Sequence, residues 1–217
     1  KLSISLYSEL ITNSIWSLQR INYGYKDVMP NRLMIDMAGA PYIDLRVDLN
    51  SFLPKKLNKN ISNKLVKNSI NKLKKFPAFH DKIEFKIIDT CYNFSLEKKK
   101  FSFLNKKEKK IYIESLKELT NNILNPKNEI LEKEIINNRK LIKKIDIIKK
   151  TNLSHIQKIF YYIHDCKKYG TLPFAGIARC AFISKSIIDS LLEEKLLEVE
   201  DVKNFNMSIK TVSKKIN

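Results

Sequence analysis

Apolar residues at helical spacing run along most of the chain and predict a mainly helical protein. From Leu6 to Ile21 an apolar residue recurs every three or four positions, which predicts a helix over about 3–22 that ends near Gly24. This helix begins at once, without a lead-in. We therefore expect the chain to be one domain of a longer protein.

The same spacing predicts six further helices. They cover about 61–73, 105–124, 126–150, 152–169, 173–192 and 199–215. Pro126 suits the first turn of a helix and Gly170 suits a helix C-terminus, so both mark breaks. The apolar stripe that includes Ile156 and Phe160 should point inward. Pro173 opens a helix that is apolar nearly all round, which predicts a central, buried position.

Two segments instead alternate between apolar and charged residues, with the period of a strand. These segments are 41–50 and 83–92, and we expect the two strands to pair. The predicted fold class is therefore mainly α, with a small two-stranded β element in the N-terminal half (α+β by strict count). We divide the chain into a mixed subdomain over 1–104 and a helical subdomain over 105–217.

The charge of the chain is strongly positive. Lys and Arg total 41 against 23 Asp and Glu, which gives +18 at pH 7 and favours nucleic acid or an anionic surface as partner. Lys, Ile and Asn, which A/T-rich codons encode, are abundant throughout, however, and Arg is scarce. The lysine runs at 98–100 and 106–110 flank Phe101 and Phe103. This pattern loosely resembles a basic patch with stacking groups, but it is typical of a solvated connector, so we do not expect nucleic acid as partner.

Cysteines and histidines indicate neither a disulfide framework nor a metal site. The chain has three cysteines, none in a Cys-x-x-Cys pair, which favours reduced thiols and a cytoplasmic location. His155 and His164 are nine residues apart and fall on opposite sides of their predicted helix, so they cannot share a metal ion. No apolar run approaches the roughly 18 residues of a membrane span, and we expect no membrane partner.

Three segments stand out from the lysine-rich background because they contain all four glycines and three of the five arginines. The first ends the helix over 3–22, where Arg20 and Asn22 project next to Gly24. These residues form either part of a pocket wall or an ordinary helix stop.

The second segment follows Gly39. Asp44, Arg46 and Asp48 alternate along the predicted strand, so they share one face and Arg46 can bridge both carboxylates. This face is either an exposed ladder of ion pairs or a polar pocket face in which Arg46 meets an anionic substrate.

The third segment runs from Asp165 to Arg179 and includes Tyr169. Free backbone N–H groups at the helix start near Pro173 can receive an anion, and Arg179 reaches the same place. A tight corner between two helices, with small residues for close packing, is the alternative interpretation.

These segments, with one more, resemble a known family. The residues Trp16–Tyr25, Pro41–Phe52, His80–Phe85 and Asp165–Arg179 are similar, in that order, to the central part of phosphoenolpyruvate synthase-like proteins. This family of phosphoenolpyruvate-utilising enzymes includes pyruvate phosphate dikinase and rifampin phosphotransferase. The stretch over about 95–150 matches in helical character alone.

The resemblance implies a division of labour among domains. An ATP-grasp domain, with ATP and Mg²⁺, supplies the phosphoryl group, a mobile domain carries it on a histidine, and a further region holds the acceptor. This chain lacks an ATP-grasp sequence, and its histidines lack the small-residue setting of a carrier. The resemblance therefore implies the acceptor-binding or docking region of a phosphotransferase that is catalytically incomplete by itself.

No catalytic residue and no cofactor of the family can be transferred onto this chain, because their motifs are absent. The proposed acceptor-binding or docking residues are Arg20, Asn22, Asp44, Arg46, Tyr169 and Arg179. The expected partners are the ATP-grasp and phosphohistidine domains of the same parent chain and a small-molecule acceptor. Pyruvate, a sugar-like hydroxyl and an antibiotic-like hydroxyl all remain open as acceptors.

Two alternatives stand beside this interpretation. The charge of +18 suits a non-enzymatic, basic helical module that binds nucleic acid. The chain can also be a degenerate scaffold that connects active neighbours. We favour the phosphotransferase because its motifs are local, whereas the charge follows a lysine bias along the whole chain.

Overall fold

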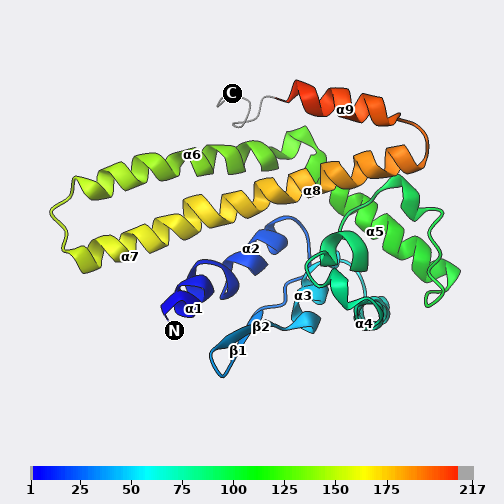
Figure 1. Ribbon diagram of the computed structural model, residues 1–217, viewed down its shortest axis with the longest axis horizontal. Helices are drawn as coiled ribbons and strands as arrows, with labels where there is room; N and C mark the ends of the chain where they lie inside the picture. Colours follow the sequence, from blue (N-terminus) through cyan, green and yellow to red (C-terminus); the bar gives the residue numbers. More distant parts are fainter. Residues whose placement is uncertain (1, 210–217) are drawn as a thin grey trace.

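Helices dominate the computed structural model, which describes residues 2–209 (Figure 1). The predicted mainly α fold with a two-stranded β element in the N-terminal half is confirmed. The strands are β1 (Met34–Met37) and β2 (Ala40–Ile43), which pair antiparallel with Met34 opposite Ile43. The α-helices are α1 (Leu2–Tyr7), α2 (Ile15–Asn22), α3 (Leu45–Ser51), α4 (Lys59–Lys75), α5 (Lys106–Leu124), α6 (Ile130–Lys149), α7 (His155–Asp165), α8 (Leu172–Glu193) and α9 (Val199–Ser208).

Short π-helical and 3-10 turns connect these helices. The π-helical turns are η1 (Ser8–Thr12), η3 (Ile83–Ile87) and η6 (Cys166–Thr171), and the 3-10 turns are η2 (Pro77–Phe79), η4 (Phe94–Leu96) and η5 (Pro126–Asn128). The helix predicted over 3–22 is interrupted after η1 and resumes as α2. It ends as predicted at Gly24, whose φ of +93° is readily adopted by glycine alone. The end of the helix predicted over 199–215 lies outside the described residues.

The strand predicted over 41–50 is wrong beyond Ile43. Asp44 begins helix α3, because its Oδ1 accepts hydrogen bonds from the backbone N–H groups of Arg46 at 2.9 Å and Val47 at 3.1 Å. An aspartate at this position satisfies donors that a helix start leaves free, and this cap outweighs the alternating pattern. Asp44, Arg46 and Asp48 therefore do not share a strand face.

The strand predicted over 83–92 is also wrong, and β2 pairs with β1 instead. Its first part is the π-helical turn η3, and its apolar residues Ile87 and Ile88 are buried in the core. Glu84, which alternation placed on an outer polar face, turns inward to an arginine of α8. The alternation therefore does not correspond to one apolar and one solvated face, because Phe85 is 46% exposed whereas Glu84 forms an ion pair within the fold.

The helices predicted over 152–169 and 173–192 form one continuous helix, His155–Glu193, in which η6 joins α7 to α8. Gly170 does not cap a helix. Pro173 lacks the N–H that an α-helix would donate to the carbonyl of Tyr169, and the Asn138 side chain donates to that carbonyl instead, at 3.4 Å. The predicted corner is absent, so the start of α8 offers no free helix terminus to an anion.

The continuity of α7 and α8 produces a helix long enough to be compared with a membrane span. Among the described residues, His155–Glu193 is the one helix whose length and composition suffice to cross a membrane, and 28% of its most apolar window is buried inside the molecule. The core helix of a globular protein meets the same criteria. The sequence missed this stretch because it separated the two helices at Gly170.

Helices α6 and α7 form an arm that extends away from the rest of the molecule (Figure 1). The predicted inward direction of the α7 stripe is wrong, because Ile156 is 81% exposed and Phe160 is 66% exposed. Only α6 packs along the outer part of the arm, so one face of α7 stays uncovered. The central burial predicted for the next helix holds for one face of α8, which includes Gly176, Arg179 and Ile183.

Gly176 is a point where α8 approaches its neighbours closely. A Cβ atom there would lie 2.5 Å from the hydroxyl oxygen of Tyr23 and 2.8 Å from Oε1 of Glu134. Tyr23 is fully buried beside Cys180 and Ile183, so its ring has little room to move. The absence of a side chain at position 176 therefore allows α2 and α6 to pack on α8.

We predict that Gly176→Ala destabilises the fold by about 1–3 kcal/mol, because overpacking outweighs the better helix propensity of alanine. Denaturant unfolding measures this change. Tyr23→Phe removes the hydroxyl nearest to the new methyl group, so the same substitution in that background should cost less. A stabilising effect of Gly176→Ala in the wild-type background would contradict the close approach.

Candidate functional site

A buried ion pair connects α2 to α3. Nη1 of Arg20 lies 2.7 Å from Oδ1 of Asp48 and also donates to the Ser51 hydroxyl. The guanidinium carbon is 3.6 Å from the ring centroid of Phe52. Burial lowers the pKa of Arg20, and the Asp48 charge opposes that shift. The carboxylate that the sequence assigned to Arg46 is therefore the partner of Arg20.

A second buried ion pair connects α8 to η3. Arg179, whose side chain is 5% exposed, donates from Nη1 to Oε2 of Glu84. Its guanidinium carbon lies 5.3 Å from the Phe52 ring centroid and 5.5 Å from that of Tyr25. Both arginines thus contact Phe52. Each has its own carboxylate, as buried charges require.

These pairs bring together the four segments that carry the family resemblance. Arg20 comes from the first, Asp48 and Phe52 from the second, Glu84 from the third and Arg179 from the fourth. We call these five residues the arginine cluster. The segments are far apart in sequence, so only tertiary packing explains their meeting.

A polar cavity of about 240 Å³ adjoins the arginine cluster at Glu84, between η3 with its following loop and α8. Its charged lining residues are Glu84, Lys86, Asp89, Lys185, Asp189 and Glu193. We call this cavity the α8 pocket. The rings of Phe85 and Phe182 meet edge to face at its side, with centroids 5.1 Å apart. The lining holds four carboxylates and two ammonium groups, and three of the carboxylates, Glu84, Asp89 and Asp189, are paired with cations.

Hydrogen bonds hold the polar groups of the α8 pocket. Nδ2 of Asn93 donates to the Ser186 hydroxyl at 3.0 Å, and Nζ of Lys185 contacts Asp189 at 2.9 Å. Oδ1 of Asn93 is buried without a hydrogen-bond partner. Buried acceptors are ordinarily satisfied, so this oxygen is available to a water molecule or a ligand donor.

The structure brings together only two of the six predicted site residues, Arg20 and Arg179. Asn22 and Arg46 are exposed, and Arg46 instead lines a shallow cavity beside α4. Asp44 is the cap of α3. Tyr169 lies in η6, where Lys144 and Lys168 approach its ring at 5.7 Å and 5.4 Å.

Sequence reasoning missed the partners Glu84 and Phe52 and the α8 pocket residues Lys185 and Asp189. Glu84 does occur in one of the motif segments, but its alternation with apolar residues indicated a strand. Lys185 and Asp189 are four residues apart on a helix, a spacing that is equally common in ordinary surface pairs. The position of Lys185 in the apolar sector of its helix indicates either a side chain that reaches solvent or a pairing with a carboxylate, but it assigned no chemistry to Lys185 or Asp189.

The cysteines and acidic groups show no metal centre within residues 2–209. No group of three or more His, Cys, Asp or Glu side chains in that part of the chain is arranged to hold an ion. Cys91 and Cys180 are buried and free, and burial raises the pKa of both thiols. Raised thiol pKa values make both cysteines poor nucleophiles.

Comparisons with known proteins give no family for this chain. No protein-family model, no curated protein and no solved structure matches it. The resemblance to phosphoenolpyruvate synthase-like proteins therefore rests on the four motif segments.

We predict that Arg20→Met destabilises the protein by about 3–5 kcal/mol, because it leaves Asp48 buried without a partner. The same substitution at exposed Arg46 is the matched control and should change stability by less than about 0.5 kcal/mol. Denaturant unfolding of both variants measures the difference. Equal losses in the two variants would contradict the assignment of Asp48 to Arg20.

A second prediction concerns Glu134 of α6, which faces Gly176 and is half-buried. Burial raises its pKa above the ordinary value of 4.5. Between 4.5 and the raised value the folded state binds more protons than the unfolded state, so this carboxyl makes stability fall as pH rises through that window. Glu134→Gln should therefore stabilise the protein more at pH 7 than at pH 4.

Unfolding free energies of the wild type and Glu134→Gln at both pH values test this dependence. Glu132→Gln, an exposed change on the same helix, is the control. If Glu134→Gln and the wild type differ equally at the two pH values, burial does not act on this carboxyl.

Proposed function

We propose that this chain is the central acceptor-binding and docking domain of a phosphoenolpyruvate synthase-like phosphotransferase in the cytoplasm. The observation that supports this most is the convergence of all four motif segments on the arginine cluster, next to the α8 pocket. In this proposal ATP and Mg²⁺ bind a separate ATP-grasp domain, and a carrier histidine on another domain delivers the phosphoryl group. Phosphoryl transfer depends mainly on positioning, which is the task assigned to this chain.

The arginine cluster has a supporting role in this function. Arg20 and Arg179 are each neutralised by a carboxylate and are buried, so they are not free to bind an anionic acceptor. Arg179 holds α8 against η3 at Glu84, which lines the α8 pocket, and Arg20 holds α2 against α3 beside the same Phe52 ring. We therefore propose them as positioning residues and assign the acceptor to the pocket.

The charge of the α8 pocket favours a neutral acceptor with hydroxyl groups. Its carboxylates Glu84, Asp89 and Asp189 are each paired with a cation, so the lining offers little unpaired positive charge to an anion such as pyruvate, whereas carboxylates accept hydrogen bonds from hydroxyl groups. A carboxylate near the attacking hydroxyl can also take its proton as a general base. Of the acceptors that the sequence left open, the sugar-like and antibiotic-like hydroxyl compounds fit this lining best.

The arm supports the docking part of the proposal. Large exposed apolar side chains gather on α6 and α7, among them Ile142, Ile147, Ile156, Ile159 and Phe160. Apolar surface of this extent is typical of an interaction site. We assign it to the neighbouring domains of the same parent chain.

The nucleic-acid alternative has less support from the structure. Phe101 is 7% exposed and packs edge to face on Tyr112 with centroids 5.7 Å apart, so its ring cannot stack on a base. Lys98 and Lys99 form ion pairs with Glu194 and Asp89. The lysine run that imitated a nucleic-acid patch is thus partly neutralised within the fold.

The test uses the complete parent chain. The reading frame should encode an ATP-grasp domain on one side of these residues and a small histidine-bearing domain on the other. Asp189→Asn should lower kcat/KM for a hydroxyl acceptor by at least about tenfold, the loss expected for one charge-assisted hydrogen bond. The melting temperature of the Asp189→Asn variant should equal that of the control, Asp146→Asn, which changes an exposed residue of α6.

Two results would contradict the proposal. A reading frame without those neighbouring domains would contradict the assignment to a phosphotransferase. Equal kcat/KM values for the Asp189 and Asp146 variants would contradict the binding of the acceptor in the α8 pocket.

A further inference from the structure

A second cavity, which shares the lining residue Asp89 with the α8 pocket, lies between α4 and the loop over 99–103. Its volume is about 180 Å³, and Lys72, Lys99 and Lys100 line it. One carboxylate, Asp89, also lines it. This is the place to which the fold brings the lysine run and the phenylalanines that the sequence singled out. We call it the lysine pocket.

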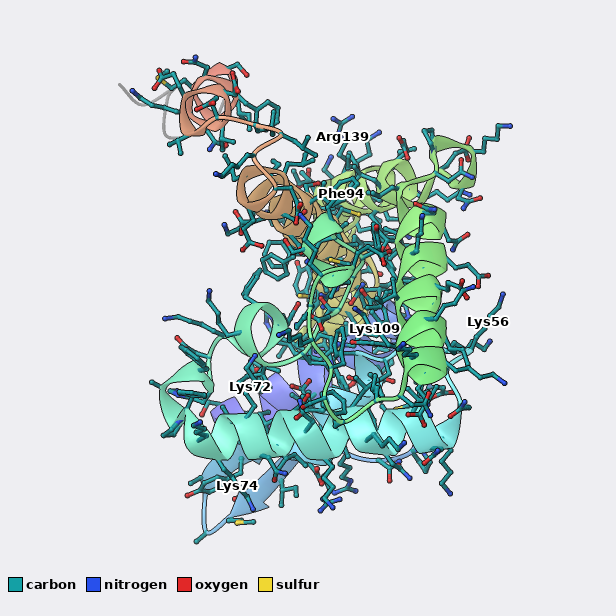
Figure 2. The ribbon with its side chains drawn as sticks, turned by 90° about the vertical axis from the view of Figure 1, so that its right-hand side faces the viewer. Lys56, Lys72, Lys74, Phe94, Lys109 and Arg139 are labelled. Carbon is teal, nitrogen blue, oxygen red and sulfur yellow. The ribbon has the colours of Figure 1, made fainter. Side chains whose placement is uncertain are left out.

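Lys72 belongs to the inner side of α4. Figure 2 shows Lys72 on the side of α4 that faces the rest of the molecule and Lys74 on the opposite side. Their spacing of two residues predicts this arrangement, because successive helical positions are about 100° apart. Lys72 lines the lysine pocket and Lys74 does not.

The lysine pocket has an excess of positive charge. Its carboxylate, Asp89, is already paired with Lys99. No ion pair among residues 2–209 involves Lys72 or Lys100. Burial lowers the pKa of Lys72, the charges of Lys99 and Lys86 lower it further, and the charge of Asp89 opposes this shift. The fold therefore holds a partly buried ammonium group near like charges, a cost that an anion in the pocket would relieve.

The other lining groups suit a compact oxyanion. Asn68, Ser69 and Ser102 supply neutral hydrogen-bond donors, and each ammonium group supplies up to three more. Apolar side chains on the remaining wall, such as Phe101, reduce the access of water and so strengthen the attraction between charges.

We propose that the lysine pocket binds a phosphate dianion, either inorganic phosphate or the phosphate group of a small monoester. Lysine binds such groups as a point charge, and the three lysines of the cavity, less the charge of Asp89, leave a charge of +2, which matches that of a dianion. The inference goes beyond the proposed phosphotransferase function and does not depend on it, because the lysine pocket lies outside the four motif segments.

The experiment is calorimetric titration of the chain with inorganic phosphate at pH 8 and constant ionic strength. The wild type should bind one phosphate, and Lys72→Gln should weaken binding by at least about tenfold, equivalent to about 1.4 kcal/mol. Lys74→Gln removes the same charge from the same helix outside the pocket, so it should weaken binding by less than about twofold. A parallel titration with glycerol phosphate shows whether a monoester binds more tightly than the free ion.

Asp89→Asn provides a change in the opposite direction. It removes the one carboxylate of the lysine pocket and should tighten phosphate binding. A damaged fold would weaken binding, so an increase in affinity cannot be explained by misfolding. Thermal unfolding without phosphate checks that each variant is folded. Lys100→Gln replaces Lys72→Gln if the latter does not fold.

Three outcomes would overturn the proposal. The first is that the wild type does not bind phosphate. The second is that Lys72→Gln and Lys74→Gln weaken phosphate binding equally. The third is that the wild type binds an oligonucleotide whether or not phosphate is present, and that Lys72→Gln abolishes this binding. The second outcome would mean that phosphate responds only to the net charge. The third would assign the lysines to nucleic acid, with the steep salt dependence of counterion release.

Discussion

The fold depends on pairing each of two buried guanidinium groups with a carboxylate beside one phenylalanine. Arg20 and Arg179 both contact Phe52, and each carries a positive charge into a largely buried region. Neither charge is tolerated there without its own carboxylate, so Asp48 and Glu84 must arrive with them. This requirement ties α2, α3, η3 and α8 to one arrangement, and the α8 pocket lies where two of these elements meet.

The sequence predicted the helices well because their apolar spacing and breaks are local. It failed where a single contact decides between two local structures. Asp44 ends a strand because its carboxylate caps a helix, and Asn138 lets a helix pass through Pro173 because its amide reaches the carbonyl that proline leaves free. The first contact joins residues two and three positions apart, so the sequence could have predicted it. The second joins residues on different helices, so the sequence alone could not predict it.

The candidate site was likewise predicted only in part. The scarcity of arginine correctly drew attention to Arg20 and Arg179, but pairing is a tertiary property. Asp48 is two residues from Arg46 and still pairs with Arg20, because α3 turns it away from its neighbour and toward α2. Residue types therefore identified these positions, and only the packing showed that both arginines are paired with carboxylates and are not free to contact an anion.

The uninterrupted helix from His155 to Glu193 has a mechanical consequence. Its 39 residues span roughly 60 Å, and they join the exposed end of the arm to the wall that carries Lys185 and Asp189. Arg179 and Glu84 anchor this helix near its middle, and the wider π-helical turn η6 lies between its two ends. The surface of the arm and one wall of the α8 pocket are therefore connected through a single helix, so a protein that binds the arm contacts the same element that lines the cavity.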